Sequence, residues 1–122
     1  MPNALAVANV AHHTLKSLEG AYVDIKRMTY GQKLERQGMI KVSFEMNKGR
    51  KDDMKGQMEM ANRIATYYEF KHCIVDHNLT DDQDNKLDLS NPFVIDGLDP
   101  RVGEEINGLI NDMNNFEDDK GN

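Results

Sequence analysis

The sequence predicts a mainly α-helical, compact domain with one or two short β-strands or a small hairpin. Two segments, residues 54–77 and 98–115, place apolar side chains at helical intervals, and the first of them contains no proline. Only residues 22–26 and 39–46 alternate apolar and polar side chains in the way that is typical of half-buried strands. At 122 residues, the chain has the length of a single domain.

The N-terminal segment has two interpretations. Its alanine-rich sequence has leucines near helical spacing, which favours a helix over residues 3–19 that ends before Gly20. The alternative is a loosely held extension, because the first ten residues carry no charged side chain and little bulk. We therefore expect residues 1–20, as an extension or a helix, to precede a helical domain that spans residues 21–115.

A second helix is predicted to begin after Thr29, because Thr29 and Gln32 have the spacing of a capping box. It is expected to end just before Gly38. Residues 39–46 then alternate strictly, which favours a strand, although a helix that continues through this glycine remains the alternative. A polar loop is expected over residues 47–53, and it leads into the long helix.

The stretch DHNLTDDQDNKLDL, residues 76–89, is rich in aspartate and asparagine and raises the question of a calcium loop. An EF-hand loop needs a glycine at its sixth position and a glutamate at its twelfth. Counted from Asp76, these positions hold Asp81 and Leu87, and the register that starts at Asp82 fails as well. We therefore expect a solvated turn in which aspartate and asparagine side chains hydrogen-bond to the backbone.

The C-terminal part of the chain has the clearest helix signals. Pro92 is expected to open a single helical turn. Asp99 is predicted to cap the last helix, with Pro100 at its first helical position. Residues 116–122 are predicted to be a frayed acidic tail. The last helix is expected to dock on the domain through one apolar stripe, which comprises Val102, Ile106, Leu109, Ile110 and Met113.

Composition excludes several classes of partner. A formal net charge of -6 argues against a nucleic-acid partner, which needs a clustered basic face. The basic cluster KGRK, residues 48–51, is followed at once by Asp52 and Asp53. No segment approaches the roughly 20 apolar residues of a membrane span, and the N-terminus lacks the basic start of a signal peptide. The single cysteine, Cys73, suits a reducing compartment, so we expect a cytosolic protein without a membrane partner.

Metal and catalytic sites are not expected. Cys73 and His77 are four residues apart on the predicted helix, but a structural zinc needs four ligands. The other candidates, His12 and His13, are distant in sequence. We expect Cys73 to pack in the core while the neighbouring histidines lie on the helix surface. No serine stands in a nucleophile motif and no glycine-rich phosphate loop is present, so the sequence predicts a protein that is not an enzyme and needs no cofactor.

The chain contains eight methionines and no tryptophan, so much of its apolar surface is flexible. Three of the methionines lie close together at the start of the long helix. One interpretation is that they fill an irregular core. The other is that they form a groove for an apolar helical partner, because unbranched thioether side chains repack at low cost. The candidate partner-binding residues are Met54, Met58, Met60 and Ile64.

Three stretches stand out when they are taken together: VDIKRMTYGQKLERQGM, YYEFKHCIVDHNLTDDQDNKLDL and LDPRVGEEINGLINDMNN. In this order, with a polar middle between the first two, they resemble the tail assembly chaperones of long-tailed, siphovirus-like bacteriophages. The resemblance covers about residues 21–115. In that family the segment before the acidic turn, the turn itself and the following helix recur as a unit. The aspartate-rich stretch thus looks like the turn after the long helix.

The resemblance implies a mainly helical protein of the host bacterial cytoplasm that binds the tape-measure protein, keeps it soluble during tail assembly and is absent from the mature virion. It also implies a longer form, made by ribosomal frameshifting, whose extension recruits the tail-tube protein. We expect homo-oligomers as well, since a long tape-measure protein needs many copies of a modest apolar surface. The alternative function is a small structural tail or head-tail connector protein of a phage virion.

Overall fold

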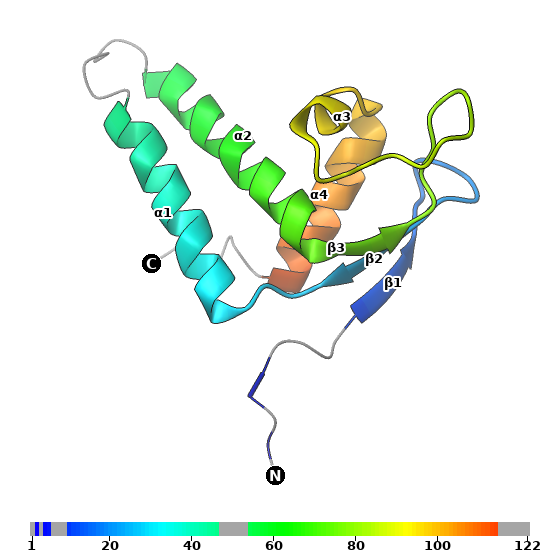
Figure 1. Cartoon of the computed structure of the whole chain (residues 1–122), viewed down its shortest axis with the longest axis horizontal. Coiled ribbons are helices and arrows are strands. Elements are labelled where there is room, and N and C mark those ends of the chain that lie inside the picture. Colours follow the sequence, from blue (N-terminus) through cyan, green and yellow to red (C-terminus); the bar gives the residue numbers. More distant parts are fainter. Residues whose placement is uncertain (1, 3, 6–9, 47–53, 115–122) are drawn as a thin grey trace.

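The computed structural model describes residues 2, 4–5, 10–46 and 54–114 of the chain. In chain order its elements are β1 Val10–Thr14, β2 Tyr22–Lys26, α1 Tyr30–Met46, α2 Met54–Cys73, β3 Ile74–His77, α3 Pro92–Asp96 and α4 Pro100–Asn114. The three strands form an antiparallel sheet in the order β1-β2-β3, and α1 and α2 project from it side by side (Figure 1). Helices dominate, but the described residues form a mixed α/β fold. The prediction of a mainly α-helical domain with at most a small hairpin is therefore wrong.

Strand β1 lies where a helix was predicted over residues 3–19, so that prediction is wrong. It pairs with β2 in antiparallel register, with Val10 opposite Lys26. The connecting turn contains Gly20 at φ 82°, a left-handed conformation that glycine adopts without a steric penalty. The ladder with β2 pairs two consecutive strands of a hairpin, from Thr14–Tyr22 to Val10–Lys26, and the helix propensity of a single segment does not report on such pairing.

Strand β2 is confirmed as predicted, and Val23 and Ile25 on one of its faces are fully buried. Strand β3 forms the other edge of the sheet, with Val23 opposite His77. The long helix was predicted to reach residue 77, but it ends at Cys73. Residues 74–77 are too few for their apolar spacing to distinguish a helix from a strand. They form a strand because they pair with the open edge of β2.

Helix α1 begins with the predicted capping box. The Gln32 N–H donates to Thr29 Oγ1 at 3.1 Å, and the Thr29 N–H donates to Gln32 Oε1 at 3.0 Å. The helix does not end before Gly38, and the strand predicted over residues 39–46 is wrong, whereas the alternative of one continuous helix is confirmed. The predicted loop at 47–53 and the predicted tail at 116–122 lie outside the described residues.

Helix α4 covers the sheet and forms the centre of the core. The Arg101 N–H donates to Asp99 Oδ1 at 2.9 Å, which confirms the predicted cap, and Pro100 is the first helical residue. Ile106 and Ile110 have no exposed surface, while Leu109 is half-buried against the core. The predicted helical turn is α3, where Asn91 Oδ1 accepts from the Phe93 N–H. The largest fully buried side chains are Phe70, Ile25, Ile106, Ile110, Val23 and Cys73.

Candidate functional site

Helices α1 and α2 form an antiparallel pair, here named the α1–α2 arm, which extends beyond the sheet and α4 (Figure 1). Helix α1 packs mainly on α2, whereas α2 also contacts α4 and β3. The inner face of α1 places Ser43 against α2, where it is buried. The outer face is therefore available to solvent over most of the length of the helix.

The outer face of α1 carries exposed apolar side chains among charged ones, in part because of the sequence pattern that suggested a strand. In a helix, residues two apart point about 200° away from each other, so strict alternation divides the apolar side chains between two faces. Ile40 and Phe44 are half-buried on the side of α2. Val42 lies on the outer face with 53% of its surface exposed, and Leu34 and Met39 are exposed as well. The signal for this surface was present in the sequence, but it was assigned to the wrong secondary structure.

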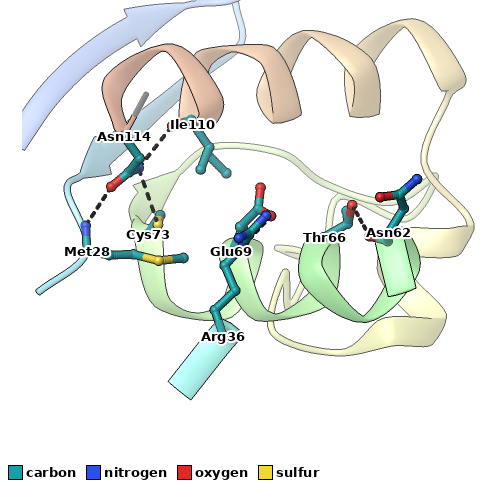
Figure 2. A network of polar contacts seen from close by, with 8 residues as sticks. All are labelled: Met28, Arg36, Asn62, Thr66, Glu69, Cys73, Ile110 and Asn114. Atoms are coloured by element: carbon teal, nitrogen blue, oxygen red, sulfur yellow. Dashed lines mark hydrogen bonds and ion pairs between the residues drawn. The ribbon is translucent and has the colours of Figure 1, made fainter. Parts of the chain in front are cut away.

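A buried ion pair fixes α1 on α2. Arg36 Nε donates to Glu69 Oε2 at 3.0 Å, and the two side chains retain 12% and 3% of their surface (Figure 2). Tyr68 is also buried in α2, and its pKa is raised by burial and by the nearby carboxylate of Glu35. These polar groups are buried where α1 packs on α2, so they favour one register of the two helices.

The base of the arm is fixed by Asn114 at the end of α4. Its Oδ1 accepts from the Met28 N–H at 2.9 Å, just before α1, and its Nδ2 donates to Ile110 O at 2.9 Å (Figure 2). The same Nδ2 lies 3.9 Å from Cys73 Sγ at the end of α2. One carboxamide therefore connects the entry of α1, the exit of α2 and the last turn of α4.

The predicted partner-binding residues all belong to α2, but they do not share one face. Met54 is the first residue of the helix, and its side chain lies outside the described atoms. Met58 and Met60 are 54% and 47% exposed and point to different sides, since they are two residues apart. Ile64 is half-buried, one turn after Met60 and on the same face.

Two open grooves flank the face of α2 that carries Met60 and Ile64. A cavity of about 540 Å³ between α2 and α3 is lined by Met60, Tyr67 and Ile95, among others. A second cavity of about 370 Å³ lies between α1, α2 and the segment before α3, and its lining includes Met39, Ile64 and Tyr67. Tyr67 thus lines both grooves, although no pattern in the sequence singled it out.

Helix α3 is held beside α2 by Asp96. The Tyr67 hydroxyl donates to Asp96 Oδ1 at 2.7 Å, and this hydrogen bond is the main cause of the raised pKa of Tyr67. Arg63 Nη2 lies 3.4 Å from Asp96 Oδ2. Both side chains of the ion pair are exposed, so its contribution to stability is small, on the order of 0 to 1 kcal/mol. Its position nevertheless places a charged rim beside the apolar lining of the larger groove.

The possible reactive groups lie apart from this surface. Cys73 is fully buried, as predicted, and burial together with Glu69 raises its pKa to about 12, so the thiol is unreactive at neutral pH. His77 is buried on β3, which corrects the prediction of a surface histidine, and its Nδ1 accepts from the Leu79 N–H at 3.0 Å. Within residues 10–46 and 54–114, no three His, Cys, Asp or Glu side chains are grouped as metal ligands.

The aspartate-rich stretch is a turn, as predicted. Asp81 Oδ1 accepts from the Gln83 and Asn85 N–H groups, both at 2.9 Å. Asp84 adopts a positive φ of 63°, which aspartate tolerates better than most residues. Asp76 pairs with Lys86 at 2.7 Å, and this contact is the main cause of the lowered pKa of Asp76. The carboxylates are therefore used to shape the loop.

Comparisons with known proteins give no relative from which a function can be transferred. The chain matches no family model, no curated protein and no solved structure. Among the helices of the described residues, none is both long and apolar enough to cross a membrane.

Proposed function

We propose that the protein is a phage tail assembly chaperone that binds apolar helical segments of the tape-measure protein through the α1–α2 arm. The sequence resemblance over residues 21–115 suggests the class of protein. The single observation that supports a binding role is the exposure of large apolar side chains on the arm, which include Leu34, Met39, Val42, Met58 and Met60.

The chemistry of this surface suits a long partner with repeated apolar stripes. A helical segment binds by placing its apolar face into a groove or against an exposed apolar ridge. Met39, Met58 and Met60 supply flexible thioether side chains that adapt to stripes of slightly different shape. Weak binding by each copy is sufficient when many copies cover one tape-measure chain. Under this proposal the protein acts in the host bacterial cytoplasm as a homo-oligomer and does no chemistry.

The test is co-purification of a tape-measure segment with variants that place a charge on the arm. Val42→Glu and Met60→Glu are expected to abolish co-purification, because a carboxylate pressed against an apolar stripe loses its hydration without gaining a partner. Both positions are exposed, so the free energy of unfolding is expected to change by no more than about 0.5 kcal/mol. Met54→Glu and Met58→Glu test the other predicted positions in the same way.

A matched control is available on the sheet. Val75 on β3 is 52% exposed, nearly the same as Val42 at 53%, but it lies outside the arm. Val75→Glu is therefore expected to retain the tape-measure segment. If Val42→Glu and Met60→Glu both fold and still retain it, the arm is not the binding surface. If the protein is present in purified virions, it is a structural tail or connector protein and the proposed chaperone function is wrong.

The longer form is tested on the gene. A slippery run of nucleotides near the last codons, followed by a long overlapping reading frame, would support a frameshifted product that also contacts the tail-tube protein. Mass spectrometry of infected cells would then detect peptides that cross the frameshift. A stop codon that no slippery run precedes would remove the frameshifted form from the proposal. The proposed binding of the tape-measure protein by the short form would be unaffected.

A further inference from the structure

A further concave surface, here named the α3–α4 pocket, lies away from the outer face of the arm. Its volume is about 390 Å³, and its walls come from the β1–β2 turn, the loop at residues 79–87, α3 and the start of α4. The lining is mostly apolar and includes Leu18, Leu79, Leu87, Phe93, Leu98 and Val102. This volume lies at the small end of the range for ligand-binding pockets and suits one or two large side chains.

Two residues of this pocket are unusually exposed for their type. Phe93 is 85% exposed, although it is the largest apolar side chain of α3, and Leu18 is 47% exposed. Phe93 lies two residues after the cap residue Asn91, whose side chain accepts from the Phe93 N–H at 3.0 Å, so the capped first turn fixes the position of Phe93. Exposed apolar side chains that gather around a concave surface typically mark a binding site.

The turn that carries Leu18 is fixed to α4. Glu105 on α4 accepts hydrogen bonds from the Lys16 and Ser17 N–H groups, both at 2.8 Å, and from Ser17 Oγ at 2.6 Å. These contacts lower the pKa of Glu105 and keep its carboxylate charged. The wall of the pocket opposite α3 is therefore held in place before any partner binds, which reduces the entropy lost on binding.

The surroundings of the pocket are acidic. Residues 80–99 contain six aspartates and one lysine. Two of these aspartates, Asp81 and Asp99, line the pocket itself. The one lysine, Lys86, is paired with Asp76 at 2.7 Å. Asp99 pairs with Arg101 at 3.2 Å, whereas Asp81 accepts from backbone N–H groups and forms no ion pair within the described residues. A partner with positive charges beside an apolar group is complementary to this arrangement.

We propose that the α3–α4 pocket binds a linear peptide segment of a partner protein that inserts one bulky apolar side chain between Phe93 and Leu18 and pairs a neighbouring Lys or Arg with Asp81. The apolar side chain supplies most of the affinity, since aromatic residues at the centre of an interface carry most of the binding energy. The charge pair selects basic segments and accelerates association. This proposal does not depend on the tape-measure function, because it uses a different surface.

The experiment measures fluorescence polarisation of a labelled peptide pool with the full-length protein. Each short peptide has a central pair drawn from Leu, Phe, Met and Ile, placed between Lys-Arg pairs. The pool is expected to bind, and replacing the central pair by Ser-Ser is expected to lower affinity by about tenfold or more. Replacing the Lys-Arg pairs by Gln-Gln is expected to lower affinity by about threefold at low salt, with a smaller effect at high salt.

Variants of the protein locate the site. Phe93→Ser is expected to lower affinity by about tenfold without changing the melting temperature, because the side chain is exposed. Asp81→Asn keeps the Oδ1 acceptor that shapes the loop but removes the charge, so only the contribution of the basic residues should be lost. Val75→Ser and Asp112→Asn, which change exposed residues elsewhere, serve as the apolar and acidic controls.

Three outcomes would overturn the proposal. The first is that the pool does not bind to wild-type protein, and the second is that Phe93→Ser binds it as well as wild type does. The third is that Val42→Ser weakens binding as strongly as Phe93→Ser, which would place the peptide on the α1–α2 arm. Sedimentation velocity of the protein alone adds a further check. A dimer that Phe93→Ser abolishes would identify a second copy of the chain, and not a peptide, as the occupant.

Discussion

Glu69 is the most deeply buried carboxylate among the described residues, and its partner Arg36 comes from the other helix of the arm. Burial of two charges costs desolvation energy that their attraction must offset, so such a pair adds little net stability. Removal of one partner has a much larger effect, because the other charge then remains in a poorly solvated place. The pair therefore specifies one arrangement of α1 on α2.

Glu69→Ala is expected to lower the free energy of unfolding by about 3 to 5 kcal/mol, measured by urea denaturation. Glu59→Ala is the matched control, because Glu59 is an exposed glutamate on the same helix and its loss is expected to cost less than about 0.5 kcal/mol. Equal, small losses for the two variants would mean that the buried pair does not hold α1 in place.

The buried side chain of His77 is expected to make the free energy of unfolding depend on pH. Its pKa is lowered chiefly by burial and further by the positive charge of Lys86, and its Nδ1 is occupied by the Leu79 N–H. The unfolded chain takes up a proton near pH 6.5, while the folded protein resists protonation of this side chain. The free energy of unfolding is therefore expected to fall as the pH drops below about 6.5, before the carboxylates titrate.

Chemical denaturation at several pH values tests this expectation. In His77→Gln, the decrease between about pH 7 and pH 5 is expected to be smaller than in the wild type, because the group that titrates is gone. His13→Gln is the matched substitution at another histidine, on the edge strand β1. An unchanged slope in His77→Gln would assign the pH dependence to another group.

Helices α1 and α4 show how the spacing of apolar residues determines which faces of a helix are buried. In α4 the apolar side chains recur every three or four residues, so they form one stripe, and Val102, Ile106 and Ile110 are buried together. In α1 they alternate, so one set faces α2 and the other faces solvent. The first pattern produces a helix that buries its apolar stripe, and the second produces a helix that leaves some apolar side chains exposed.

Two substitutions test the docking of α4. Asp99→Ala is expected to cost on the order of 1 kcal/mol, because the Arg101 N–H loses its cap. Ile106→Ala is expected to cost about 2 to 5 kcal/mol, because the side chain is fully buried and its removal leaves a cavity. Thermal and urea denaturation would measure both. A loss for Ile106→Ala as small as that for Asp99→Ala would mean that the helix is not packed on the sheet.

At the scale of the whole molecule, the sheet and α4 form the stable part and the arm depends on it. Helix α1 makes most of its contacts with α2, and the core residues lie around β2, α4 and the last turns of α2. Regions with few buried apolar contacts open more readily than the core. The two binding surfaces proposed above lie on different elements, α1 and α2 for the first and α3 and α4 for the second.

Native-state hydrogen exchange is expected to resolve this difference. Amides of α1 should exchange faster than those of β2 and α4, with rates that report a local opening and not global unfolding. Glu69→Ala should accelerate exchange in α1 more than in α4, because it removes a contact between α1 and α2. Equal protection of all three elements would show that the arm and the sheet unfold as one cooperative unit.

Several local features were determined by the sequence alone. The capping box at Thr29 and Gln32, the cap at Asp99, the strand at 22–26 and the apolar stripe of α4 depend on residues that are close in the chain. Their physical causes, a side chain that satisfies a nearby N–H or a spacing that matches one periodicity, are local as well. The exposure of the arm had a sequence signal too, but alternation is ambiguous until the backbone conformation is known.

Tertiary structure decided the rest, because the decisive interactions join separate segments of the chain. Residues 10–14 and 74–77 become strands since each pairs with an edge of β2, and no local pattern contains that partner. The continuation of α1 through Gly38 depends on packing against α2, and the exposed faces of Met58 and Met60 depend on what α2 covers. Pairing between strands and burial arise only when the chain has folded, so the sheet and the α3–α4 pocket could be identified only from the three-dimensional arrangement.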